Sequence, residues 1–341
     1  MGQALLIADQ LSAVRAEPTL HDARGRTKRK LRLSLTDRCN LRCLYCMPDK
    51  PSWLPRAELM PCAEIVDLVR VFVRDLGITE IRLTGGEPLL RGDVVEIVRE
   101  LDALRGDGLQ RIAMTSNGGL LPRYAKELKA AGLDDLNISL DAIDPEAFKR
   151  LTRGDVHAVL RGISAAQAAG LPVKLNCVVV RDYNEDQILP LAHWAHDAGL
   201  PLRYIEFMPL DGRGDWSKAR VVTEAQILEH LRPFGLLKAL PRDRDPASYF
   251  QLLDGYRIGV ISTISKPFCA SCDRLRVDAR GALYTCLFSA RGHDLRSTLL
   301  ENDGSNALAE LIRLRVWNKD VGYVASPGYV ERPITMHHLG G

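Results

Sequence analysis

The chain has 341 residues, of which 46 % are hydrophobic and 26 % charged, so it exceeds one minimal domain and can bury a sizeable core. Its formal net charge of +3 is too small to indicate nucleic-acid binding, and it has no run of about 18 uncharged apolar residues that would predict a membrane span. Because the N-terminus lacks the basic region and uninterrupted apolar run of a signal peptide, we expect a cytoplasmic protein.

Residues 1–30 predict a poorly ordered lead-in, and from residue 31 strands and helices alternate along the chain. The expected strands are 31–36, 80–84, 111–115, 136–140, 172–180 and 202–207. The expected helices are 63–76, 94–104, 122–131, 145–151, 156–169, 187–198 and 223–231. Such alternation is typical of a parallel sheet, and its length predicts an incomplete (β/α)6 TIM-like barrel over residues 31–232.

After residue 232 the alternation stops, and residues 233–341 predict a C-terminal extension, which we treat as a second domain. A hairpin is expected over 249–262 around Asp254-Gly255, with helical stretches near 294–301 and 307–316. The chain ends in Gly340-Gly341.

Eight cysteines lie unevenly along the chain, and metal binding explains them better than disulfides because no secretion signal precedes them. Cys62 and Cys177 stand alone and are interpreted as small buried side chains. The other six form two tight triplets, Cys39/Cys43/Cys46 and Cys269/Cys272/Cys286.

The first triplet has the spacing C-x3-C-x2-C and follows the first expected strand. Three thiolates can hold three corners of a [4Fe–4S] cluster and leave one iron open for the amino and carboxyl groups of a ligand. The alternative is a zinc site, but no nearby histidine supplies a fourth ligand.

The second triplet, C-x2-C-x13-C, again offers three thiolates for a [4Fe–4S] cluster. A zinc ribbon completed by His293 is the alternative here. Arg274 and Arg276 lie between these cysteines, and because the guanidinium fork suits phosphate, they indicate an anionic ligand.

A further motif, Gly85-Gly86-Glu87-Pro88, directly follows the second expected strand. Its glycines allow a backbone to approach a ligand closely, and the proline stiffens the turn. Together with the first triplet and Tyr45 before its last cysteine, the motif resembles the signature of radical S-adenosylmethionine enzymes. The resemblance implies reductive cleavage of S-adenosylmethionine to methionine and a 5′-deoxyadenosyl radical, which abstracts hydrogen from a substrate.

The whole combination resembles the GTP 3′,8-cyclase family of molybdenum cofactor biosynthesis. The resemblance rests on 31–47, 81–90, 115–118, 137–141, 173–176, 203–209, 268–287 and the diglycine end. It implies conversion of GTP to 3′,8-cyclo-7,8-dihydro-GTP, with the guanine held at the second cluster. The implied partners are an external electron donor and, downstream, cyclic pyranopterin monophosphate synthase. The sequence does not decide whether the chain forms a homodimer.

The resemblance also carries expectations for single residues. The first cluster would be held by Cys39, Cys43 and Cys46, and the second by Cys269, Cys272 and Cys286. S-adenosylmethionine would be lined by Tyr45, Gly86, Ser139 and Met208. GTP would be contacted by Arg32, Arg82, Thr115, Lys174, Arg274, Leu275 and Arg276. Catalytic roles fall to Arg32, Arg274, Arg276 and the tail residues Gly340 and Gly341, which would enter the active site.

Charge supports this set independently, because GTP carries about four negative charges that the five cationic side chains would balance. Asp273 departs from the family, where asparagine is more familiar after the second cysteine of that triplet. Two alternatives remain at this point: a radical S-adenosylmethionine enzyme that modifies peptides, and a non-enzymatic iron–sulfur or zinc protein.

Overall fold

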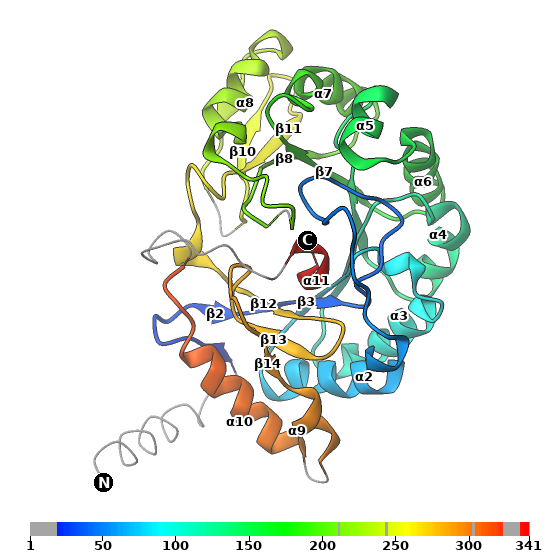
Figure 1. Ribbon diagram of the computed structural model, residues 1–341, viewed down its shortest axis with the longest axis vertical. Helices are drawn as coiled ribbons and strands as arrows, with labels where there is room; N and C mark the ends of the chain where they lie inside the picture. Colours follow the sequence, from blue (N-terminus) through cyan, green and yellow to red (C-terminus); the bar gives the residue numbers. More distant parts are fainter. Residues whose placement is uncertain (1–18, 211, 243–244, 302–303, 323–334, 341) are drawn as a thin grey trace.

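The computed structural model describes residues 19–210, 212–242, 245–301, 304–322 and 335–340 (Figure 1). The predicted barrel strands are confirmed, with ends that shift by one or two residues. They are β3 (Lys30–Ser34), β4 (Glu80–Thr84), β5 (Arg111–Ser116), β6 (Asp135–Ser139), β7 (Val173–Val179) and β8 (Leu202–Glu206). These strands pair in parallel in chain order, as expected for repeated strand–helix units.

The helices between the strands cover the outer face of this curved sheet (Figure 1). They are α2 (Cys62–Arg70) with the π-helical turn η2 (Val71–Asp75), α3 (Val94–Asp102), α4 (Leu121–Ala130), α5 (Pro145–Thr152), α6 (Val156–Ala168), α7 (Ile188–Asp197) and α8 (Glu224–His230). Short 3₁₀ turns are η1 (Arg56–Glu58), η3 (Pro88–Leu90), η4 (Ala103–Asp107), η5 (Glu185–Gln187), η6 (Lys218–Arg220), η7 (Arg232–Phe234) and η8 (Cys269–Ser271).

The C-terminal segment extends both edges of this sheet. On one side β11 (Arg257–Ile261) pairs in parallel with β8 and continues into β10 (Ser248–Gln251) and β9 (Lys238–Ala239). On the other side β12 (Arg274–Val277) pairs in parallel with β3 and continues into β13 (Ala282–Tyr284) and β14 (His293–Asp294). The 12-stranded sheet runs from β14 to β9 without closing, which confirms the incomplete barrel.

The expected disorder of residues 1–30 is corrected for residues 19–30, whereas residues 1–18 lie outside the described part. β1 (Leu20–His21) and β2 (Thr27–Lys28) form a hairpin beside α10 (Gly304–Trp317). The reason is packing: Leu20 is 2 % exposed, and the Lys28 side chain is fully buried with an ion-pair partner. The remaining helices are α9 (Arg296–Leu300) and α11 (Met336–Leu339).

The strands β3 and β4 have one apolar face and one charged face. On β3 and β4 the leucines and isoleucine pack under the helices, while Arg32 and Arg82 alternate with them and face the inside of the barrel. The interior therefore carries charge where most barrels carry branched apolar side chains. Across the described residues, every helix is too short or too polar to cross a membrane.

Candidate active site between two cysteine triplets

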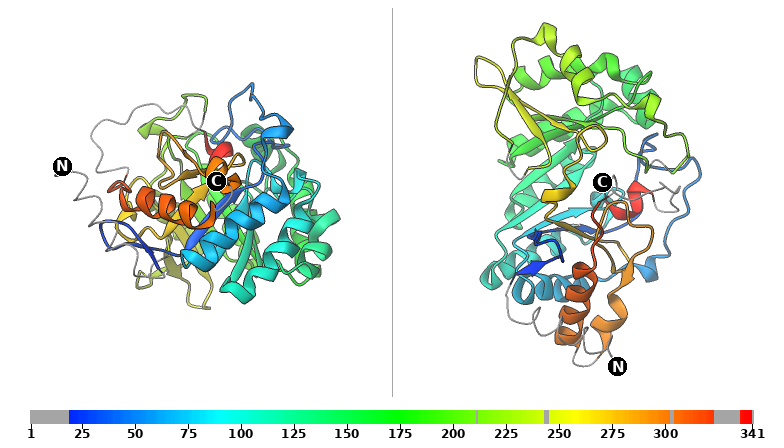
Figure 2. Two further views of the ribbon diagram at one scale, coloured as in Figure 1. Left: turned by 90° about the horizontal axis from the view of Figure 1, so that it is seen from below. Right: turned by 90° about the vertical axis from the view of Figure 1, so that its left-hand side faces the viewer.

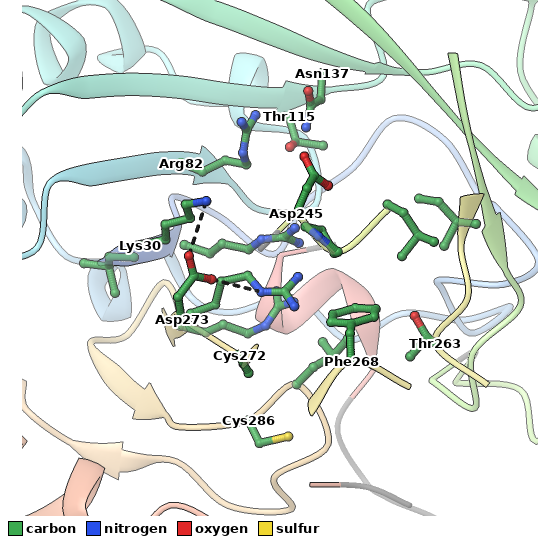
Figure 3. A pocket seen from close by; sticks show the side chains of 18 of the residues that line it. Lys30, Arg82, Thr115, Asn137, Asp245, Thr263, Phe268, Cys272, Asp273 and Cys286 are labelled. Atoms are coloured by element: carbon green, nitrogen blue, oxygen red, sulfur yellow. Dashed lines mark ion pairs between the residues drawn. The ribbon is translucent and has the colours of Figure 1, made fainter. Parts of the chain in front are cut away.

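A cavity of about 230 Å³ occupies the inside of the partial barrel (Figure 3). It is lined by most of the residues predicted to contact GTP, namely Arg32, Arg82, Thr115, Lys174, Arg274 and Arg276, and by all three cysteines of the second triplet. Leu275 does not line it, because strand alternation places this side chain on the opposite face of β12, where it is fully buried.

The register of the sheet aligns the arginines. Arg276, Arg32 and Arg82 occupy paired positions on β12, β3 and β4, so the three side chains stand in one row on the inner face. One pleat closer to the strand starts, Arg274, Lys30 and Glu80 form a second row. The first row, with three arginines on adjacent strands, is unfavourable without a counter-ion.

Two of these cations form no ion pair within the described part of the chain. Arg32 and Lys174 make no hydrogen bond or ion pair with any other residue that the structure describes. Burial, followed by the nearby charges of Arg276, Arg274, Arg82 and Arg203, holds the pKa of Arg32 well below its usual range. Burial and the Arg203 charge also lower the pKa of Lys174. An anion in the cavity would remove this cost.

The other cations are only partly compensated. Arg82 lies 3.5 Å from an Asp135 oxygen, and Lys30 lies 3.3 Å from an Asp273 oxygen (Figure 3). Asp273 also lies 3.9 Å from Arg274. The departure from the family's asparagine therefore places a carboxylate between two cations at the cavity wall.

Uncharged groups complete the wall. The Phe268 ring lies 4.9 Å from the Arg274 guanidinium, a cation–π distance. Asn137 points its side chain toward the cavity beside Thr115 (Figure 3), and its Oδ1 is buried without a hydrogen-bond partner among the described residues. A buried acceptor of this kind indicates that a ligand donates to it.

The second triplet lies at the edge where the barrel strands begin. Cys269 and Cys272 flank η8, just before β12, and Cys286 follows β13, which returns antiparallel to the same edge. Burial alone would raise the pKa of Cys272, but Arg274, Lys319 and Lys28 outweigh it and lower this pKa to about 7. The surroundings of this sulfur therefore favour the thiolate that an iron–sulfur cluster needs.

The first triplet lies at the opposite edge, where the strands end. Its loop is anchored to α5, because the backbone amides of Arg42 and Leu44 donate to the carbonyls of Thr152 and Leu151. Burial, together with the Glu87 charge, raises the pKa of Cys39 to about 11 in the metal-free protein. The Cys39 sulfur already accepts from the Leu41 amide at 3.4 Å and from Asn117 Nδ2 at 3.8 Å.

All eight cysteines are free, so both triplets keep the thiols that a cluster requires. Among the described residues, no three His, Cys, Asp or Glu side chains gather closely enough to hold a single metal ion. In a cubane cluster each thiolate binds a different iron, so its ligands lie farther apart than those of a single zinc ion. Each triplet offers three free thiols, which are the donors that a [4Fe–4S] cluster takes.

The diglycine of the Gly-Gly-Glu-Pro motif packs against the first-triplet loop. A Cβ atom at Gly85 would lie 2.4 Å from the Thr36 carbonyl oxygen, and one at Gly86 would lie 2.4 Å from that of Arg38. Only glycine permits this approach, which brings the amides of Gly86 and Glu87 within 2.7 Å of those two oxygens. Buried Glu87 then accepts from the Asn117 amide at 2.7 Å and ties the turns after β4 and β5 together.

The C-terminal tail lies between the two triplets. Cys46 and Cys286 pack against one small apolar cluster of Leu210, Phe288 and Met336, the last of which begins α11. α11 lies in the middle of the molecule when it is viewed down its shortest axis (Figure 1), whereas the right-hand view of Figure 2 shows it toward one side.

Gly340 follows α11 and is held at the cavity. Arg276 donates to its carbonyl at 2.6 Å, and a Cβ at Gly340 would lie 2.1 Å from Thr84 Cγ2 at the end of β4. Gly340 therefore lies next to a cavity-lining arginine, while Gly341 lies outside the described residues.

The residues expected at S-adenosylmethionine are dispersed around the first triplet. Met208 lines the cavity, whereas Tyr45, Gly86 and Ser139 lie in or beside loops at the same edge without lining it. The Tyr45 hydroxyl donates to Asp141 at 2.7 Å, and burial raises the pKa of Asp141 to about 6.

Several polar side chains of the cavity had no role in the sequence analysis, among them Arg203, Asn176 and Lys319. Arg203 Nε donates to Asn176 Oδ1 at 3.0 Å, which fixes the guanidinium at the wall. Alternation on the strands could have placed Arg203 and Asn176 inward. No sequence pattern marks Lys319, which reaches the cavity through packing of the chain after α10.

An open α/β barrel with a cysteine-triplet loop at the end of its first strand is the architecture of the radical S-adenosylmethionine enzymes. The Radical SAM superfamily matches residues 33–195, and Molybdenum Cofactor Synthesis C matches residues 200–324. The solved structure of Streptococcus suis SuiB bound to S-adenosylmethionine superposes with a TM-score of 0.60 at 12 % identity, covering 84 % of this chain and 68 % of that one, and so supports the fold.

Curated relatives narrow the class. The GTP 3′,8-cyclase of Streptomyces coelicolor is 43 % identical over 330 residues, covering 94 % of this chain and 96 % of that protein. GTP 3′,8-cyclase 3 of Mycobacterium bovis is 41 % identical, covering 88 % of this chain and 81 % of its own. The chain belongs to the GTP 3′,8-cyclase family, and it is a radical S-adenosylmethionine enzyme of molybdenum cofactor biosynthesis.

Proposed function

We propose that this chain binds GTP in the described cavity, between two [4Fe–4S] clusters, and converts it to 3′,8-cyclo-7,8-dihydro-GTP. Cys39, Cys43 and Cys46 would hold the first cluster and Cys269, Cys272 and Cys286 the second. When bound, the first cluster and S-adenosylmethionine supply the electron and the 5′-deoxyadenosyl radical that the reaction needs. The second cluster is proposed as the position where the guanine is held.

One observation carries the choice of a triphosphate: buried and half-buried cations face the cavity, and two half-buried ones, Arg32 and Lys174, lack a partner among the described residues. Arg32, Arg82, Arg274 and Arg276 come from neighbouring strands and converge on one space. Such a cluster of charge is costly unless a polyanion enters, and the triphosphate of GTP supplies about four negative charges.

The protein's part in the reaction is positional. The new bond joins C3′ of the ribose to C8 of the guanine, so the triphosphate must be fixed while the sugar faces the first triplet. The cations of β3, β4 and β12 would bind the phosphates. Asn137 Oδ1, which has no hydrogen-bond partner among the described residues, can accept a hydrogen bond from the ligand. Gly340, held by Arg276, would close the cavity toward the tail.

The first test is 5′-deoxyadenosine formation by anaerobically reconstituted protein, supplied with S-adenosylmethionine and a reductant. We expect GTP to stimulate formation strongly and ATP to leave it at the nucleotide-free rate. Cleavage that no nucleotide stimulates would keep the radical enzyme and contradict the substrate. Analysis of iron and sulfide should give about eight of each per chain.

The arginines between the second-triplet cysteines give a sharper prediction. Replacing Arg276, which is 5 % exposed, with alanine should weaken GTP binding by about 1.5–3 kcal/mol, because a charge-assisted hydrogen bond to phosphate is lost. Equilibrium dialysis under anaerobic conditions measures this, with Arg280→Ala as a matched control. Arg280 follows the same strand but is solvent-exposed and outside the cavity. Unchanged affinity in both Arg274→Ala and Arg276→Ala would exclude a role for these two arginines in binding GTP.

Three finer expectations are part of this proposal and rest on the family. The product would pass to cyclic pyranopterin monophosphate synthase, an external donor would reduce the clusters, and the enzyme would act in the cytoplasm. The structure favours no peptide substrate, since the cavity wall is cationic rather than shaped for an extended chain.

A further inference from the structure

The hairpin formed by β1 and β2 is built around one buried carboxylate. Asp22 Oδ2 lies 2.6 Å from Arg26 Nε and 2.8 Å from Lys28 Nζ, and the side chains of Asp22 and Lys28 are fully buried. The other oxygen, Oδ1, accepts from the backbone amides of Arg24 at 3.0 Å and Arg26 at 3.1 Å, which fixes the turn. Burying the charges of Asp22, Arg26 and Lys28 costs free energy unless each charge is paired or hydrogen-bonded.

Both cations also donate to the second triplet. Lys28 Nζ donates to the carbonyl of Cys272 at 2.7 Å, and Arg26 Nη1 donates to the carbonyl of Cys269 at 2.9 Å. The backbone amides of Arg29 and Lys30 donate to the carbonyl of Asp273. The hairpin therefore fixes the backbone on both sides of η8, the turn that presents two of the three thiols.

The same hairpin holds the chain that follows α10. Arg26 donates to the carbonyls of Asp320 at 2.8 Å and Val321 at 3.0 Å, and the Ala23 amide donates to Trp317 at 3.1 Å. Gly322, next in the chain, lies so close to Cys269 that a Cβ there would be 2.6 Å from its sulfur.

This held segment reaches the third cysteine as well. Lys319 is 3 % exposed, and its ammonium donates to the carbonyl of Thr285, the residue before Cys286. Arg24 in turn donates to the carbonyl of Lys319. The hairpin, or the segment that it holds, thus contacts Cys269, Cys272 and Thr285, the residue next to Cys286.

We propose that residues 19–28 act as a clamp that positions the three thiols of the second cluster, with Asp22, Arg26 and Lys28 as its positioning residues. The proposal rests on the assignment of that cluster to Cys269, Cys272 and Cys286. The clamp acts through carbonyl oxygens, so it sets where the sulfurs stand without being a ligand. The burial of the clamp side chains agrees with this role.

A hairpin that only stabilised the fold would affect both triplets alike, whereas a clamp affects one. The first triplet lies at the other edge of the barrel and is anchored to α5, so no described clamp residue contacts it. The variants are Lys28→Met, which keeps the length of the side chain, and Asp22→Asn, which keeps its shape. Arg29→Met is the matched control, because the Arg29 side chain is exposed beside the same strand.

The experiment reconstitutes each full-length variant anaerobically and measures iron per chain, the paramagnetic signals of the reduced clusters, GTP affinity and GTP-independent 5′-deoxyadenosine formation. For Lys28→Met and Asp22→Asn we expect either loss of about four of about eight irons or at least tenfold weaker GTP binding. GTP-independent cleavage should stay within about twofold of the unsubstituted protein, as should every property of Arg29→Met.

Hydrogen exchange of the metal-free chain gives a readout that needs no cluster. In both variants the amides of 269–273 and 319–322 should exchange faster, while those of the first-triplet loop should not change. Gly322→Ala tests the same clamp from its other side, should a hairpin variant fail to fold. It should displace Cys269 and lose second-cluster iron while cleavage without GTP continues.

The outcomes separate the two assignments. Eight irons, unchanged signals and unchanged GTP affinity in all three variants would overturn the clamp and leave the second cluster in place. Loss of iron from both clusters together would reduce the hairpin to a general stabiliser and also overturn the clamp. An unsubstituted protein that binds only about four irons would instead overturn the second cluster, and the clamp with it.

Discussion

Replacing Cys43 with alanine is expected to abolish cleavage of S-adenosylmethionine. Cys43 is the central thiol of the first triplet, and its loop is bonded to α5 through the flanking residues Arg42 and Leu44. The loop therefore cannot move another side chain into the empty position. Two thiolates hold two corners of a cubane cluster, so the cluster would be lost or would bind too loosely to pass an electron.

The measurement is 5′-deoxyadenosine formation with reductant and GTP, together with iron per chain, which should fall from about eight to about four. Cys62→Ala is the matched control, because Cys62 is a free thiol on α2 outside both triplets. The control should cleave at the unsubstituted rate. Normal cleavage by Cys43→Ala would contradict the assignment of the first cluster and leave the radical chemistry without a site on this loop.

The repeated part of the fold could be predicted because its signals are local. Each barrel strand is a short apolar or alternating run, and glycines such as Gly77 and Gly132 mark the ends of the preceding helical stretches. The observed ends differ from the predicted ones by one or two residues, since the last turn of a helix is set by packing. The C-terminal strands β10 and β11 were also predicted, as a hairpin.

Long-range pairing could not be predicted in the same way. β12 has four residues and pairs with β3 from more than 240 positions away, a contact that leaves no periodic trace in the sequence. This pairing is what brings Arg276 into the row with Arg32. It also places the second triplet at the edge where the strands begin, whereas parallel barrels usually collect their chemistry where the strands end.

Residues 19–30 were misjudged because their charges suggested solvent. Lysine and arginine are almost never fully buried unless they are paired, and the partner of Lys28 is a single aspartate six residues earlier. Nothing in the spacing of Asp22 and Lys28 distinguishes them from ordinary surface charges. Only the fold shows that Lys28 reaches the second triplet while Asp22 pairs with it.

Among the candidate site residues, those on strands were the easiest to place. The apolar residues of β3 and β4 pack under the helices, so alternation along these strands puts Arg32 and Arg82 on the cavity side. The same rule sends Leu275 to the opposite face of β12. Residues on loops, such as Tyr45 and Met208, could be assigned only through resemblance, because loop conformation is not encoded in a simple period.

The second cluster should be separable from the first by one substitution. Replacing Cys286 with alanine is expected to stop formation of the cyclised product while GTP-independent 5′-deoxyadenosine formation continues. Cys286 follows β13 at the edge of the barrel opposite the first-triplet loop, so its loss leaves the ligands of the first cluster in place. The substitution does remove a side chain that lines the cavity together with Arg274 and Arg276.

The expected loss of product is about a hundredfold or more, because a guanine displaced by an ångström no longer presents C8 to the radical at C3′. Iron should fall to about four per chain, and Cys62→Ala again serves as the control that loses a thiol but no cluster. If Cys286→Ala still formed product at the normal rate, the second triplet would have no part in holding the nucleotide. The cations on β3, β4 and β12 would then have to position GTP alone. We expect these cations to bind the phosphates and not the base, so they would not fix C8 near C3′.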